Sequence, residues 1–175
     1  MRSLCAVRTV RVGSPRERSD ALEVWRSANE ARGLAPTSAR IARVEQKLAE
    51  PTAYLVLACD DEGAVGMALA EPYRAQHGSG PVTPDRGHVS MVFVAPGRWG
   101  CGIGRELLDA LHRAMRERGY NAASLWTRAS NERARRLYEG CGYQLTADVK
   151  QLPGGDEIVR YEIALSGSPR AVDAA

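Results

Sequence analysis

The sequence predicts one domain of mixed α-helices and β-strands, an α+β fold, over residues 1–165. Segments that alternate polar and apolar residues, which indicate strands, recur along the chain. Between them lie segments with apolar residues three and four positions apart, which indicate amphipathic helices. A length of 175 residues suits a single core, and we expect residues 166–175 to form a flexible C-terminal tail.

The first part of the chain predicts an edge strand, two helices and a hairpin. Ser14 and Glu17 have the spacing of a capping box, with Pro15 at the first helical position between them. A helix therefore begins there, and a turn of acidic residues and glycine at 60–63 joins the two strands that follow. The expected elements are a strand at 4–12, a helix from Ser14 to Gly33, a helix at 38–49, and strands at 53–59 and 64–71.

The middle of the chain predicts a long irregular loop, because residues 73–86 are rich in glycine and proline. A strand with two apolar faces follows at 88–94. After Gly104, leucines at helical spacing predict a helix that ends at Gly119. The remaining expected elements are a strand at 122–127, a helix at 131–139, and strands at 142–150 and 158–165.

The most informative segment joins the strand at 88–94 to the next helix. Gly100, Gly102 and Gly104 alternate at this junction, so that bare backbone N–H groups point towards whatever lies over the helix N-terminus. These donors and the positive end of the helix dipole suit a pyrophosphate. The dinucleotide fingerprint is excluded because its third glycine would fall on Arg105. No Gly-Lys-Ser/Thr or Gly-x-Ser-x-Gly segment is present, which excludes a P-loop and a serine-hydrolase elbow.

Two blocks of this sequence resemble the GNAT superfamily of N-acetyltransferases. Residues 94–108 (VAPGRWGCGIGRELL) are similar to its acyl-CoA-binding motif, a Val-x-Pro, an Arg/Gln-x-x-Gly-x-Gly/Ala loop and a Leu-Leu helix. Residues 130–143 (SNERARRLYEGCGY) are similar to its Asn-x-x-Ala-x-x-Leu-Tyr signature. The chain departs from the first motif in having Trp99 at the Arg/Gln position, with Arg98 one place earlier, and Cys101 before Gly102.

The resemblance implies a GNAT fold and acetyl-CoA as co-substrate. This fold has a mixed, mostly antiparallel sheet of about six or seven strands, flanked by about four helices, with strands four and five splayed. The main chain of Val92, Phe93 and Val94 would then bind the pantetheine arm. The pyrophosphate loop and further cofactor contacts would comprise Arg98, Trp99, Gly100, Cys101, Gly102, Ile103, Gly104, Arg105, Asn131 and Tyr138.

The resemblance also gives Tyr138 the role of the acid that protonates the departing thiolate. Helical spacing alone would instead place Tyr138 in the core, together with Ala134 and Leu137. For the base that deprotonates the amine, the candidates are Glu71 and His88, followed by Glu30. A water relay without a dedicated base is compatible with the family.

The acceptor pocket of this fold is formed by the first two helices and the connection between strands three and four. Two carboxylates with aromatic walls favour a small cationic primary amine. A rival acceptor is a protein N-terminus, because residues 125–131 (LWTRASN) resemble a segment of ribosomal-protein acetyltransferases. A third alternative is a non-catalytic acyl-CoA sensor. The residues expected to contact the acceptor are Trp25, Glu30, Tyr54 and Tyr73.

Composition excludes several other partners. A net charge of +3, without a basic stretch interleaved with aromatic residues, argues against nucleic acid. No apolar run approaches the ~20 residues of a membrane helix, and the first residues lack the apolar core of a signal peptide. The four cysteines have no C-x-x-C spacing, so we expect reduced thiols, a cytoplasmic protein and no metal site. Homodimers are common in the family, although no segment here specifies an interface.

Overall fold

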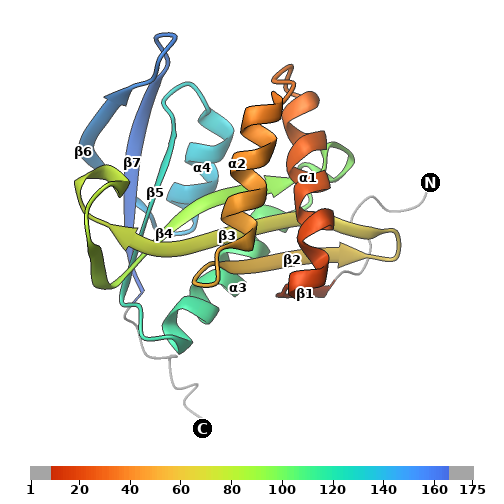
Figure 1. Cartoon of the computed structure of the whole chain (residues 1–175), viewed down its shortest axis with the longest axis horizontal. Helices are drawn as coiled ribbons and strands as arrows, with labels where there is room; N and C mark the ends of the chain where they lie inside the picture. The colour runs from red at the N-terminus through yellow and green to blue at the C-terminus, as the bar shows by residue number, and fades with distance from the viewer. Residues whose placement is uncertain (1–8, 166–175) are drawn as a thin grey trace, which may run out of the picture.

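The computed structural model describes residues 9–165 and is built around one seven-stranded sheet (Figure 1). Its strand order is β1-β2-β3-β4-β5-β7-β6, and within these residues β4 and β5 alone pair in parallel. The mixed, mostly antiparallel sheet agrees with the predicted fold class. The strands are β1 (Thr9–Val12), β2 (Tyr54–Asp60), β3 (Gly63–Arg74), β4 (Val82–Val94), β5 (Ala122–Arg128), β6 (Gln144–Gln151) and β7 (Glu157–Ala164).

Four α-helices cover the two faces of the sheet, two on each face. They are α1 (Arg18–Glu30) and α2 (Ser38–Ala49) on one face, and α3 (Ile103–Glu117) and α4 (Glu132–Gly140) on the other. The order of elements agrees with the order expected from the sequence. Residues 4–8 of the predicted first strand and the predicted tail at 166–175 lie outside the described residues.

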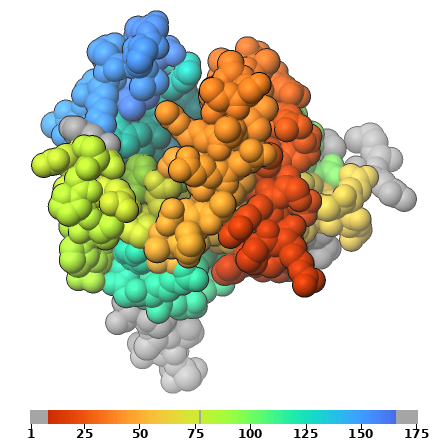
Figure 2. Space-filling model, in the orientation of Figure 1, coloured from red at the N-terminus to blue at the C-terminus, as the bar shows by residue number. Residues whose placement is uncertain are grey.

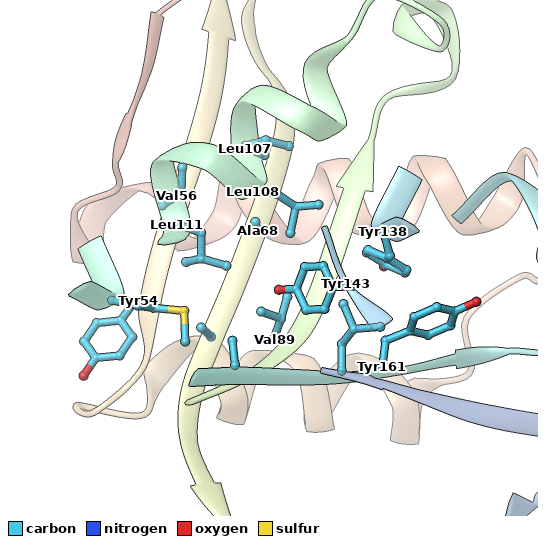
Figure 3. Packing of buried hydrophobic residues seen from close by; sticks show 14 of the residues in the cluster. Tyr54, Val56, Ala68, Val89, Leu107, Leu108, Leu111, Tyr138, Tyr143 and Tyr161 are labelled. Atoms are coloured by element: carbon cyan, nitrogen blue, oxygen red, sulfur yellow. The ribbon is translucent and has the colours of Figure 1, made fainter. Parts of the chain in front are cut away.

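The alternation of strand residues divides the core into two layers. On β2, Tyr54 and Val56 pack into the layer beneath α3, whereas Leu55 and Leu57 pack into the layer beneath α1 and α2. Figure 3 shows part of the α3 layer, where Leu107, Leu108 and Leu111 of α3 lie over the sheet. The strands β2, β3 and β4 thus contribute apolar side chains to both layers, which fixes their register.

Helix starts follow the capping residues of the sequence. The backbone N–H of Ser14 donates to the Glu17 carboxylate over 2.8 Å, as a capping box requires. This cap begins a one-turn 3₁₀ helix at Pro15–Glu17, which leads into α1. Asn131 caps α4, since its side-chain oxygen accepts from the N–H of Ala134 over 3.2 Å.

The two parallel strands separate soon after they meet. Pairing runs from Arg86 beside Ala122 to Val89 beside Leu125, four residues on each strand. Beyond this point β4 continues to Val94 and β5 to Arg128 without pairing with each other. The predicted splay of strands four and five is therefore present, and the backbone of β4 beyond Val89 has no strand neighbour on the β5 side.

Half of the irregular loop predicted at 73–86 is strand. β3 extends to Arg74 and β4 begins at Val82, and these two residues pair. A short connection remains, with a 3₁₀ turn at Gln76–Gly78. Pro84 lies within β4, where the pairing with β3 is irregular between Pro72 and Arg74, and Asp85 adopts a positive φ of 58°.

Candidate active site

A cavity of about 410 Å³ lies where β4 and β5 separate. It is bounded by the end of β4, the loop that contains Gly100 and Gly102 (the glycine loop), the start of α3 and one side of α4. Ala28 of α1 and Arg32, just beyond the end of α1, complete the lining. Every residue that the sequence predicted to bind a cofactor lines this cavity, except Cys101. The lining residues among those predicted are Val92, Phe93, Val94, Arg98, Trp99, Gly100, Gly102, Ile103, Gly104, Arg105, Asn131 and Tyr138.

The glycine loop has the geometry of an anion cradle. Gly100 and Gly102 have positive φ angles of 86° and 77°, which residues with a Cβ adopt only at a cost. Gly104 allows α3 to approach α4, because a Cβ there would lie 2.8 Å from Leu137. The first N–H groups of α3, at Ile103 and Gly104, have no partner within the helix and border the cavity. The loop therefore fits the pyrophosphate that its sequence predicted.

Arg98 and Trp99 hold this loop from outside. The Arg98 guanidinium donates to Asp60 and to Glu62, each over 2.9 Å, so it joins the loop to the β2–β3 turn instead of pointing freely into the cavity. The Trp99 indole N–H donates to the carbonyl of Val94 over 2.8 Å. Arg98 and Trp99, where the chain departs from the Arg/Gln position of the motif, thus brace the cradle from outside.

Two arginines that the sequence did not assign to the cofactor also line the cavity. The Arg133 guanidinium lies 4.9 Å from the centre of the Trp99 ring, and Arg32 follows α1. Together with Arg105 they add positive charge around the cradle, which favours an anionic ligand. Arg133 stands two residues after Asn131 in the second motif, and this spacing is the one sequence signal that could have identified it.

Tyr138 belongs both to the core and to the cavity. Its side chain is buried, with ring centres of Tyr143 and Tyr161 at 5.8 Å and 6.2 Å (Figure 3). Burial raises the pKa of its phenol to about 12, while the charge of Arg32 acts in the opposite direction. The phenol is therefore protonated at neutral pH. No hydrogen bond to its hydroxyl forms within residues 9–165, so its proton is free for a ligand.

A second, smaller cavity of about 120 Å³ lies on the α1–α2 face of the sheet. Figure 2 shows the surface hollowed between α2 and the β6–β7 hairpin. The two first-ranked candidate bases, Glu71 and His88, line this cavity, whereas the third, Glu30, does not; Tyr73, one of the residues expected to contact the acceptor, also lines it. The remaining lining residues are Pro72, Arg74, Gly78, Trp126, Lys150 and Arg160, none of which the sequence singled out.

The two candidate bases are neighbours on paired strands but differ in their surroundings. Glu71 is bound by the Lys47 ammonium, which lies 2.7 Å and 2.8 Å from its two carboxylate oxygens. His88 approaches the buried Ser124 hydroxyl at 3.3 Å through Nδ1. Burial lowers the pKa of His88 to about 4, so its imidazole is neutral at pH 7 but weakly basic. Its advantage over Glu71 as a proton acceptor is that no cation within residues 9–165 binds it, whereas Lys47 holds the Glu71 carboxylate.

Three of the four residues expected to contact the acceptor line neither cavity. Trp25 is 3% exposed and packs in the layer beneath α1 and α2. The Tyr54 side chain faces the opposite layer, where its hydroxyl donates to that of Tyr120 over 3.2 Å. Glu30 is exposed at the end of α1. Helical spacing and strand alternation place these residues in helices and strands but do not say which face of the sheet each one occupies. The structure therefore corrects their assignment to the acceptor site.

Within residues 9–165, no cluster of His, Cys, Asp or Glu side chains could hold a metal ion. The described cysteines, Cys59, Cys101 and Cys141, form no disulfide. The part of the chain that the structure describes contains no helix long and apolar enough to cross a membrane.

Comparison with known sequences gives one family and several relatives. The profile of the acetyltransferase (GNAT) family matches residues 19–143. A mycothiol acetyltransferase of Propionibacterium freudenreichii is 41% identical over 69 residues, which is 39% of this chain and 22% of that protein. Further matches carry the same name, and the chain spans less than a third of the length of these relatives.

Solved structures share the fold at low sequence identity. A GNAT-family acetyltransferase from Desulfovibrio desulfuricans has a TM-score of 0.75 and 21% identity, over 91% of this chain and 100% of that one. The ribosomal-protein-S18-alanine N-acetyltransferase of Escherichia coli has a TM-score of 0.73 and 18% identity, over 95% and 99%. The acetyltransferase yncA of Salmonella typhimurium, solved with acetyl-CoA, has 0.69 and 20%, over 95% and 99%.

Proposed function

Because the chain belongs to the acetyltransferase (GNAT) family, we propose that it transfers the acetyl group of acetyl-CoA to a primary amine of a small molecule. Transfer is direct, within a ternary complex of protein, acetyl-CoA and acceptor. One observation carries the proposal: the cavity at the β4–β5 split combines a glycine cradle, a length of β4 backbone without a partner on its β5 side, and a protonated tyrosine.

Each part of this cavity suits one part of acetyl-CoA. The glycine loop and the N-terminus of α3 bind the pyrophosphate through backbone N–H groups. The main chain of Val92, Phe93 and Val94 binds the pantetheine arm, and Asn131 contacts the cofactor from the start of α4. Arg133 and Arg105 add charge near the phosphates. The bound cofactor supplies an acetyl thioester.

Residues of the chain then accept the proton from the amine and donate a proton to the thiolate. The acceptor nitrogen forms a bond to the acetyl carbon and the carbon–sulfur bond breaks. Once the new carbon–nitrogen bond has made the amine proton more acidic, the neutral imidazole of His88 receives it directly or through water, and Tyr138 gives its proton to the thiolate. Glu71 ranks behind His88, because Lys47 already occupies its carboxylate.

A small acceptor is favoured over a protein N-terminus by the size of the second cavity. The β3–β4 connection contributes Gly78 to its wall, and its volume of about 120 Å³ accommodates a group of a few atoms. The rival acceptor is supported by residues 125–131 and by the likeness in fold to the S18 alanine acetyltransferase. The cytoplasm, with its reducing conditions, is the proposed location, in keeping with the finding that the cysteines within residues 9–165 form no disulfide.

A CoA-release assay tests the proposal. Acetyl-CoA is offered with polyamines, aminoglycosides, amino acids, short peptides and the acceptor of mycothiol acetyltransferase. We expect release with one class of small amine, and a loss of about 10²-fold or more in kcat for Tyr138→Phe, with acetyl-CoA affinity unchanged in calorimetry.

Tyr54→Phe is the matched control, because it removes a buried phenol that borders neither cavity. It should leave kcat unchanged. Release with peptides alone would favour the protein N-terminus as acceptor. Tight acetyl-CoA binding without release from any amine would favour the non-catalytic sensor.

A further inference from the structure

The second cavity carries an excess of positive charge. Arg74, Lys150 and Arg160 line it, against a single carboxylate, that of Glu71. Glu71 is already bound by Lys47, which lies just outside the lining. The cationic amine expected from the sequence would therefore meet cations here, with no carboxylate left free to receive it.

Two of these cationic side chains, Arg160 and Lys150, have hydrogen-bond donors that no described carboxylate binds. Arg160 binds Asp148 over 2.7 Å and also Glu162, but its Nε is buried without any hydrogen-bond partner. A buried donor without a partner costs stability unless a ligand or water satisfies it. Lys150 lies 4.6 Å from the Trp126 ring centre, and no carboxylate of residues 9–165 forms an ion pair with it.

Two aromatic rings hold these cations in position. The Tyr73 ring has the Arg160 guanidinium at 5.2 Å and the Arg86 guanidinium at 5.1 Å from its centre. Arg86 also shares Glu162 with Arg160. The strands bring these groups together, since Arg160 of β7 pairs with Trp126 of β5. The positive wall is thus part of the packed sheet, in contrast to mobile surface side chains.

The cations of the second cavity also act on the pKa of His88. Burial is the main cause of its lowered pKa, and among the charged groups around it Lys47, Arg160 and Lys150 lower the pKa further while Glu71 raises it. Three cations thus act on the candidate base against one carboxylate. An anion bound beside them would find a favourable potential.

We propose that the second cavity binds the carboxylate of the acceptor, so that the substrate class is small amines that also carry an acid group, such as amino acids. This inference rests on the proposed acetyl transfer. A volume of about 120 Å³ is below the ~300–1,000 Å³ of sites that enclose a whole ligand, so it suits one functional group of a larger acceptor. The cavity borders the same strand, β4, as the cofactor cavity.

The experiment compares acids with their own amides. Glycine, β-alanine, 4-aminobutyrate and L-phenylalanine, and the corresponding amides, are offered with acetyl-CoA in the CoA-release assay. The amide keeps the shape but removes the charge, and in 4-aminobutyrate the distant amine keeps nearly the same basicity. We expect at least one acid to exceed its amide about tenfold in kcat/KM, chiefly through KM.

Lys150→Gln should reduce this preference severalfold, with the KM for acetyl-CoA unchanged. Arg113→Gln, which removes an exposed arginine of α3 outside both cavities, should leave the preference intact. Lys150 is preferred to Arg160 as the target because it makes no ion pair within the described residues whose loss would disturb the sheet.

Calorimetry with CoA-saturated protein measures acid and amide binding independently of turnover. Equal binding and equal kcat/KM for acids and amides would overturn the carboxylate site while leaving the acetyltransferase proposal standing. CoA release from no amine, with an acid still bound more tightly than its amide and weakened by Lys150→Gln, would support the site and count against the proposed activity.

Discussion

His112 predicts how acid destabilises the helix that presents the glycine cradle. It lies in the core on α3, 5% exposed, and its Nε2 is 2.8 Å from the Tyr143 hydroxyl. Burial, with a smaller contribution from the charge of Arg116, lowers its pKa from 6.5 to about 4. The folded state therefore holds this imidazole neutral, whereas in the unfolded chain it becomes protonated below pH 6.5.

The magnitude follows from linkage. The stability that the protein keeps by holding His112 neutral is fully present above pH 6.5 and is lost as the pH falls from there towards 4. Protonation of His112 in the unfolded chain lowers the free energy of unfolding by about 2 kcal/mol at pH 5, which corresponds to about 1.5 pKa units. Well below pH 4 the loss reaches about 3.4 kcal/mol. His112→Gln keeps a neutral polar side chain at every pH and should remove this part of the acid sensitivity.

The assay is urea unfolding of the wild type and of His112→Gln at pH 7.5 and pH 5.0. The variant costs some stability at pH 7.5 through imperfect packing, but its deficit should shrink, or reverse, by about 2 kcal/mol at pH 5.0. His88→Gln provides a parallel measurement at a half-buried histidine whose pKa is also lowered to about 4. The same wild-type-to-variant difference at both pH values would refute the reasoning.

Two further predictions concern the cradle and the candidate base. Gly102→Ala should destabilise the protein by about 1 kcal/mol and weaken acetyl-CoA binding in calorimetry, because its φ of 77° is unfavourable for alanine. Gly97→Ala, with nothing within 4 Å of the added carbon, should change neither, and equal effects of both would contradict this account. Lys47→Met should raise the pKa of His88 in an NMR titration, since it removes a cation and frees the Glu71 carboxylate; a lower pKa would disprove it.

The cofactor cavity could be predicted in large part, because its residues are contiguous. The glycines and the start of α3 form one segment, and Tyr138 and Asn131 form another. Local chemistry explains the first: a strand-to-helix turn with alternating glycines exposes backbone donors whatever the rest of the fold does. The resemblance supplied the second, since spacing alone places Tyr138 in the core.

The acceptor side could not be predicted in the same way. Lys150 and Arg160 lie on β6 and β7, where each looks like an ordinary charge on an alternating strand. Only the pairing of β7 with β5 brings Arg160 beside Trp126. Tyr54 failed for the related reason that alternation separates two faces without saying which helices cover each. The strand pairing at Arg74 and Val82 was hidden by neighbouring glycines and prolines.

The short parallel pairing between β4 and β5 has a mechanical consequence. Four residue pairs connect two half-sheets, β1 to β4 and β5 to β7, each held internally by antiparallel ladders. A linear ligand that lies between the separated ends of β4 and β5 and hydrogen-bonds to β4 restrains the two half-sheets relative to each other. Bound acetyl-CoA should therefore suppress separation of the two half-sheets at the β4–β5 junction. In hydrogen exchange, we expect the half-sheets to open independently without acetyl-CoA and as a single unit when it is bound.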